Sequence, residues 1–146
     1  MQVQFYQVTR GTVEAVLPRL LERALGAGLR VALRVPDDLE RARLDRHLWE
    51  YRPDSFLPHG AEDGPSPAEQ PVLLTRGDTA ANGAAMLVAL APALPRVGFR
   101  RVALVFAGED AAGAARAEWK ALKADGFSPT YWFQGERGWE EKRLKA

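Results

Sequence analysis

The chain has 146 residues, of which 47% are hydrophobic and 27% charged, as expected for one soluble domain with one core. Its 20 basic and 19 acidic side chains give a net charge of +1, which argues against bulk electrostatic binding to duplex DNA but allows a small basic patch. There is no cysteine, so disulfides, thiolate metal sites and cysteine nucleophiles are excluded.

Strand patterns and helix patterns alternate along the chain. Strands are indicated by short apolar or alternating runs, and helices by apolar residues recurring every three to four positions. This alternation predicts a three-layer, Rossmann-like α/β domain with a largely parallel sheet. In chain order we expect a strand at 3–8, a helix at 13–25, a strand at 29–35, a helix at 36–48, strands at 71–75, 84–90 and 101–106, a helix at 109–123 and a strand at 130–133.

Local signals refine these elements. Thr12 is suited to cap the first helix, and Pro18 should kink that helix or delay its start. The strand at 29–35 alternates so that one face is apolar and the other carries arginines. Residues 84–90 are apolar throughout, which favours a strand covered on both faces but also fits a short helix.

The whole chain, residues 1–146, is expected to form one domain. Residues 60–70 are rich in glycine, proline and acids without periodicity, which predicts a mobile loop. Residues 135–146 form a charged C-terminal tail that contains Trp139. The N-terminus has no secretory-signal pattern and no apolar run reaches membrane-spanning length, so we expect a cytoplasmic protein without membrane contact.

A nucleotide cofactor is not expected. The sequence has neither the G-x-x-x-x-G-K-[ST] nor the G-x-G-x-x-G pattern that cradles phosphates. The turn at 9–12, where a nucleotide would bind in such a fold, is too short for a dinucleotide fingerprint.

The two histidines offer little chemistry. His47 fits a packed or half-exposed helix position. His59 could act as a base, but no serine or cysteine stands in a nucleophile motif. Glu62 and Asp63 could bind a metal only together with His59, and acids in such a loop are better explained as solvated, so no metal is predicted.

The helix at 109–123 carries a basic stripe. Arg116, Lys120 and Lys123 share one face, and Trp119 borders it. Periodicity alone favours an ordinary amphipathic helix with Trp119 in the core. The alternative is a pocket for an anionic ligand with an apolar or aromatic group, such as a peptide end, whose carboxylate the cations would hold.

The segment 49–59 is too aromatic for an ordinary loop and is broken by Pro53 and Pro58. Rigid, irregular backbone with bulky apolar side chains either plugs a core or lines a site.

These motifs together resemble the χ (chi) subunit of bacterial DNA polymerase III. The combination of Leu48-Trp49 with Ser55-Phe-Leu-Pro-His59 is the most specific part, and Ala115-Arg-x-x-Trp-Lys120 is moderately specific. The other matching segments are the strand with Phe5-Tyr6, Arg41-x-x-Leu-Asp-x-x-Leu-Trp49, Pro71-Val-Leu-Leu74 and Gly126-Phe127.

The resemblance implies a Rossmann-like domain without catalytic or nucleotide-binding function. Members of that family link the clamp loader, through a psi subunit, to the single-stranded-DNA-binding protein, whose acidic C-terminal tail ends in phenylalanine. Contact with DNA would then be only indirect. Carried over to this sequence, the tail site would comprise Phe56, Phe106, Arg116, Trp119 and Lys120, with the cations on carboxylates and the aromatics around the terminal ring.

Two rival hypotheses remain. One is a small α/β hydrolase or nucleotide-dependent enzyme that uses His59 with the nearby acids. The other is a structural module in which the aromatic segment only fills the core.

Overall fold

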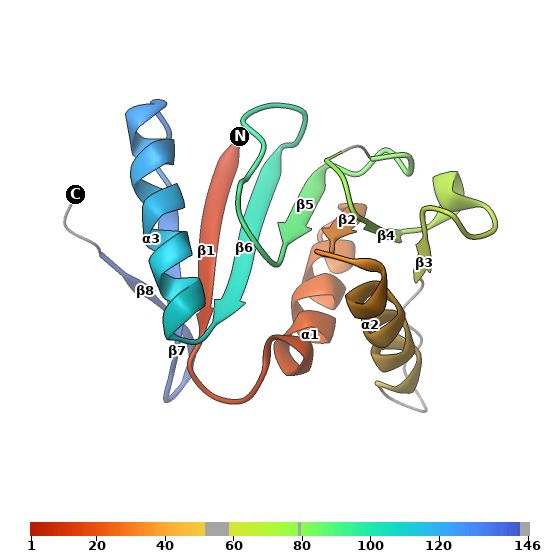
Figure 1. The fold of residues 1–146 in the computed structure, drawn as a ribbon, viewed down its shortest axis with the longest axis horizontal. Helices are drawn as coiled ribbons and strands as arrows, with labels where there is room; N and C mark the ends of the chain where they lie inside the picture. The colour runs from red at the N-terminus through yellow and green to blue at the C-terminus, as the bar shows by residue number, and fades with distance from the viewer. Residues whose placement is uncertain (52–58, 79, 144–146) are drawn as a thin grey trace.

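The computed structural model describes residues 1–51, 59–78 and 80–143 (Figure 1). Within these residues an eight-stranded sheet is combined with three α-helices. In chain order the elements are β1 (Gln2–Val8), α1 (Val13–Gly26), β2 (Val31–Arg34), α2 (Asp38–Glu50), β3 (His59–Ala61), a 3-10 helix (Pro67–Glu69), β4 (Val72–Thr75), β5 (Met86–Ala89), β6 (Arg101–Ala107), α3 (Glu109–Ala124), β7 (Thr130–Gly135) and β8 (Gly138–Lys142).

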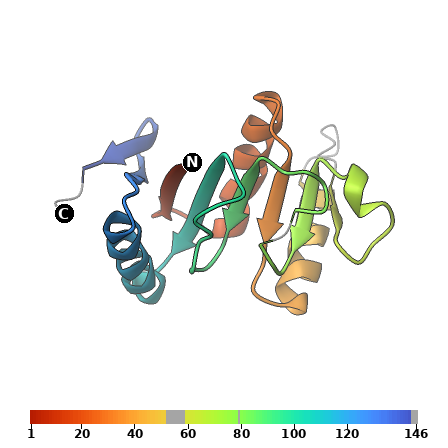
Figure 2. The same cartoon turned by 90° about the horizontal axis from the view of Figure 1, so that it is seen from above.

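The sheet runs in the order β3-β4-β2-β5-β6-β1-β7-β8, from the right to the left of Figure 2. All neighbouring strands are parallel except β7 and β8, which form an antiparallel hairpin. One face is covered by α1 and α2 around a core that includes Leu17, Leu44 and Val88. The other face is covered by α3 around a core that includes Phe5 and Leu87. The predicted three-layer α/β fold with a largely parallel sheet is confirmed.

Helix α1 begins where the sequence predicts its cap. The Thr12 hydroxyl accepts a hydrogen bond from the Ala15 backbone N–H at 3.3 Å. The helix then continues through Pro18 to Gly26. Pro18 therefore does not delay the start of the helix, which was one of the two effects expected of it.

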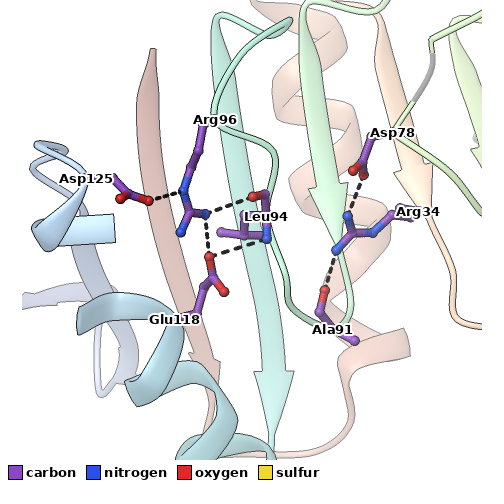
Figure 3. A network of polar contacts seen from close by, with 7 residues as sticks. All are labelled: Arg34, Asp78, Ala91, Leu94, Arg96, Glu118 and Asp125. Atoms are coloured by element: carbon purple, nitrogen blue, oxygen red, sulfur yellow. Dashed lines mark hydrogen bonds and ion pairs between the residues drawn. The ribbon is translucent and has the colours of Figure 1, made fainter. Parts of the chain in front are cut away.

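Strand β2 shows the alternation predicted at 29–35, and it is covered on both faces: Leu33 packs in the core with α1 and α2, and Ala32 packs in the core with α3. Val31, Ala32 and Leu33 are all fully buried. Arg34, on the face predicted to carry arginines, donates to Asp78 Oδ1 and to the Ala91 carbonyl, each at 2.5 Å (Figure 3). The predicted alternation is therefore confirmed in β2, with Arg34 on the second face held by hydrogen bonds to the segments that follow β4 and β5.

The ambiguous apolar run at 84–90 is a strand. All four residues of β5 are buried, because β5 lies in the middle of the sheet between β2 and β6. No helix within the described part of the chain is long and apolar enough to cross a membrane.

The interval 60–70, predicted as a mobile loop, is partly regular. Strand β3 reaches into it by pairing with Val72–Leu74 of β4, and the 3-10 helix follows. Its acids are also engaged. Glu62 accepts hydrogen bonds from the Thr75 hydroxyl and the Arg76 backbone, and Asp63 pairs with Arg41.

The predicted charged tail at 135–146 is likewise partly a strand. Residues Gly138–Lys142 form β8, which pairs with β7 from Gly135 to Tyr131. Trp139 turns onto the α1 face and packs edge-on against Tyr6, with 5.1 Å between the ring centroids. The tail therefore extends the sheet by one strand beyond β7.

Candidate partner-binding site

Helix α3 has one buried face and one cationic face, as its sequence predicts. Ala115, Trp119 and Leu122 lie against the sheet and are at most 7% exposed. Arg116 and Lys120 are exposed one position farther around the helix. The spacing of apolar side chains thus fixes which cations face outward.

The predicted aromatic residues lie beneath this helix in one cluster. Trp119 packs edge-on against Phe5 at 5.3 Å and against Tyr131 at 6.0 Å between ring centroids. Phe106, 3% exposed at the end of β6, lies edge-on to Tyr131 at 6.1 Å. The structure therefore brings Phe106 and Trp119 together through Tyr131, and it places both in the core rather than in an open socket.

Tyr131 is the member of this cluster that the sequence did not single out. Its hydroxyl donates a hydrogen bond to Gln7 Oε1 at 2.8 Å. Burial raises the pKa of Tyr131 above its usual value, and the nearby positive charge of Arg116 opposes that rise. Arg116 is thus electrostatically coupled to the aromatic cluster. The only sequence signal for Tyr131 is its position in the alternation of side chains along β7. Because Tyr131 pairs with Phe5, both side chains point toward α3.

The indole of Trp119 carries an unsatisfied donor. Its Nε1–H is buried and has no hydrogen-bond partner in the described residues. Such a group costs about 1–3 kcal/mol relative to a satisfied one. The Lys123 ammonium lies 5.9 Å from the centre of the same ring. An acceptor could satisfy this N–H only if the side chains that cover it moved, and it would then lie close to the Lys123 cation.

The rotation of α3 is fixed by a polar network (Figure 3). Glu118, 7% exposed, accepts from Arg96 at 2.5 Å and from the Leu94 backbone N–H at 3.4 Å. Arg96 also binds Asp125, just after the helix, at 2.9 Å. These contacts tie α3 to the segment between β5 and β6, so Trp119 faces the sheet.

The same network leaves α3 with an uncompensated positive edge. Arg96 satisfies the two acids Glu118 and Asp125. Among the described residues no carboxylate pairs with Arg116 or Lys120. Two exposed cations one helical turn apart are therefore available to an external anion.

Phe56, predicted to complete the site, lies outside the described residues. The chain resumes at β3, which is four strands from β6 and its Phe106. The described residues therefore join four of the five predicted site residues, Phe106, Arg116, Trp119 and Lys120.

The buried His59 has a structural role in this conformation. Its side chain has no exposed surface, and Nε2 lies 3.1 Å from Asp45 Oδ1. Its ring also contacts Trp49, with 4.8 Å between ring centroids. These contacts join β3 to α2 and do not present the imidazole to a substrate.

The corner where a nucleotide phosphate would bind is filled by a side chain. The backbone N–H groups of Thr9 and Arg10 both donate to Gln134 Oε1 at 2.8 Å. Backbone donors at this position would otherwise be suited to an anion. In the part of the chain described, there is also no group of three histidine, aspartate or glutamate side chains placed to hold a metal ion.

Comparison with known proteins places the chain in a family. The model of the family described as "DNA polymerase III chi subunit, HolC" matches residues 1–130. The DNA polymerase III subunit chi of Pseudomonas aeruginosa is 32% identical over 132 residues, covering 86% of this chain and 92% of that protein. A probable DNA polymerase III subunit chi of Rickettsia prowazekii is 28% identical over 91 residues, covering 62% of this chain and 55% of that protein. The family match spans most of the fold, from β1 to the start of β7, and so this chain belongs to the DNA polymerase III chi subunit family.

Proposed function

We propose that this protein is a non-catalytic accessory subunit of the DNA polymerase III clamp-loader complex. In this role it binds the acidic C-terminal tail of the single-stranded-DNA-binding protein and links that protein to the replication machinery in the cytoplasm. A psi subunit or another clamp-loader component would hold it in the complex. Membership of the chi family supports this role.

The tail would dock along the exposed edge of α3. Lys120 would hold the terminal carboxylate, and Arg116 would hold an acidic side chain one turn away. The terminal phenylalanine ring would insert beside Trp119 and Phe106. Because both described aromatics are nearly buried, docking requires a local movement of the side chains around Trp119.

One observation carries the proposal: α3 exposes the unpaired cations Arg116 and Lys120 beside Trp119, whose buried Nε1–H has no partner among the described residues. Glu118 and Asp125, the acids in and just after the second half of this helix, are bound to Arg96, so they do not compete for those cations. A free carboxylate beside an apolar ring is the ligand that satisfies all three groups. The Gln134 side chain in the nucleotide corner supports a non-catalytic role as well.

The test is a titration with a fluorescent acidic peptide ending in Asp-Ile-Pro-Phe, beside the same peptide with an amidated C-terminus. The free acid should bind in a salt-sensitive manner, and amidation should abolish most of the binding. Lys120→Ala should weaken binding about tenfold or more without unfolding the domain. The matched control is Lys142→Ala, which removes the same charge from β8 and should leave binding unchanged.

Equal binding of the acid and amidated peptides would mean that the protein does not recognise the terminal carboxylate, and the proposal would fail. Equal losses in Lys120→Ala and Lys142→Ala would show a general charge effect, and the assignment to α3 would then be wrong.

A further inference from the structure

A second surface, on the opposite face of the sheet, has the features of a binding groove. A hollow of about 730 Å³ lies between α1 and the β7–β8 hairpin. Its wall on α1 includes Arg19 and Arg23, spaced i and i+4 on one face of the helix. Arg10 and Arg137 contribute from beyond β1 and from the hairpin turn. We call this hollow the α1 groove.

The arginines of the α1 groove form no ion pair within the described part of the chain. Among the described residues no ion pair joins Arg10, Arg19, Arg23 or Arg137 to a carboxylate, although other arginines of the chain are paired. Four unpaired guanidinium groups around one hollow are notable in a chain with a net charge of only +1. The local excess of positive charge makes an anionic ligand the favourable occupant.

Three acids of the hairpin lie near this surface. Glu136 and Glu140 line an adjoining hollow that shares Arg10 and Arg137. On the groove face itself, Glu141 is opposite Trp132 in the hairpin register. Arg19 and Arg23 on α1 are the two cations of the groove that do not line the hollow containing the glutamates.

Aromatic rings line the sheet side of the α1 groove. Tyr6, Trp132 and Trp139 all line it, and each is only partly buried. The Trp132 indole N–H is already bound to the Thr130 hydroxyl at 3.0 Å, so this residue offers mainly its ring. The groove therefore has arginine side chains at its sides and aromatic rings along its floor.

This arrangement differs from a site for a peptide end. A chain end needs one cation beside one closed apolar socket, whereas these arginines are spread along an open hollow on three separate parts of the chain. Phosphates repeated along a backbone match spread cations, and successive bases match several rings. All four cations are also arginines, which form forked hydrogen bonds with phosphate and stack on planar bases.

We propose that the α1 groove binds a short segment of single-stranded nucleic acid, with phosphates on Arg19 and Arg23 and bases against Trp132 and Trp139. The contact is direct and involves few phosphates, so binding is weak and its log–log salt slope is small, about 0.7 for each phosphate contacted. It lies on the face of the sheet opposite α3, and its test is independent of the peptide-tail proposal.

The test is fluorescence anisotropy of a labelled oligo(dT) of about 12 nucleotides with the full chain, between roughly 50 and 200 mM salt. Arg19→Ala/Arg23→Ala should weaken binding about tenfold at the lower salt concentration and reduce the log–log salt slope by about 1.4. Arg46→Ala/Arg100→Ala removes the same charge from exposed positions elsewhere and should change little. Glu141→Gln should strengthen binding a few-fold, because it removes the acid opposite Trp132.

Circular dichroism confirms that each variant is folded before it is compared. Failure of the wild-type chain to bind the oligonucleotide overturns the proposal, and so do equal losses in the two double variants. An amidated acidic peptide is titrated in the same way, as a representative of protein ligands. If it binds more tightly than the oligonucleotide and depends on Arg19 and Arg23, the groove is a protein-docking site and the nucleic-acid assignment is wrong.

Discussion

On strand β1 an aromatic residue is buried in the core on one face and lines a groove on the other. Phe5 points toward α3 and is completely buried among Trp119 and Tyr131. The next residue, Tyr6, points toward α1 and lies in the wall of the open α1 groove beside Trp139. Both faces are aromatic, but only one is closed by a helix.

The difference follows from coverage by the helices and not from residue type. Helix α3 lies directly over the aromatic cluster and is held there by the Arg96–Glu118 contact. On the other face α1 packs over β2 and β6, whereas the β7–β8 hairpin extends past it (Figure 2). An aromatic residue on this sheet is therefore core or surface according to which element lies above it.

The largest expected contrast is in the stability of tryptophan variants. Trp119→Ala removes a ring that is 7% exposed and should lower the free energy of unfolding by about 3–5 kcal/mol. Trp132→Ala removes a partly exposed ring and should cost about 1 kcal/mol. Urea denaturation measures both. Similar losses in the two variants would mean that the two faces are packed equally well.

The polar contact that closes the α3 face should give the next largest effect. Arg96→Ala leaves the Glu118 carboxylate nearly buried without its cation and should cost about 2–3 kcal/mol. Arg46→Ala, on the exposed side of α2, is the matched control and should change stability by about 0.5 kcal/mol or less. A loss in Arg96→Ala no larger than in the control would show that the contact does not hold α3 in place.

The hairpin on the groove side has a smaller anchor. Gln134→Ala leaves the Thr9 and Arg10 backbone N–H groups without their acceptor and should cost about 1 kcal/mol. Gln134→Glu keeps an oxygen acceptor in place and should retain most of the stability. Thermal unfolding of the two variants at the same pH checks this order, and a greater loss in Gln134→Glu would contradict the assigned role.

The smallest effect is a pH dependence shared by both faces. Burial is the main reason that the pKa values of Tyr6 and Tyr131 lie above their usual value of about 10. Below that pH both the folded and the unfolded states keep the phenol protons and no stability is lost. Above it the unfolded chain releases them first, so the free energy of unfolding should fall as pH rises.

Tyr6→Phe and Tyr131→Phe should each make this alkaline fall shallower. The measurement is the free energy of unfolding at a series of pH values from about 9 upward. If both variants follow the wild-type curve, neither phenol is responsible for the alkaline loss.

Much of this fold could be predicted because local patterns and tertiary packing agree. The apolar run of β6 and the capped start of α1 are examples. Strands β3 and β8 could not be predicted in the same way. His59–Ala61 and Gly138–Lys142 contain no β-branched residue, and they are strands because β4 and β7 offer them pairing edges.

The positions of the candidate residues on α3 could also be predicted. The spacing of Arg116, Trp119 and Lys120 along the sequence determines their positions around α3, independently of the tertiary fold. Tyr131 was missed because its contact with Trp119 depends on the parallel pairing of β1 and β7. The α1 groove was missed because Arg10, Arg19 and Arg137 converge only after the hairpin forms.

The most direct test of the central claim is an NMR titration that follows the four indole N–H signals of the protein. Adding the free-acid peptide should shift the Trp119 signal, because the carboxylate reaches the unsatisfied Nε1–H of that residue. The indole N–H signals of Trp132 and Trp139 should not shift. The amidated peptide should shift none of them at the same concentration. If the free-acid peptide instead moves Trp132 and Trp139 while Trp119 stays unchanged, the tail binds in the α1 groove, and the assignment of α3 as its docking surface is wrong.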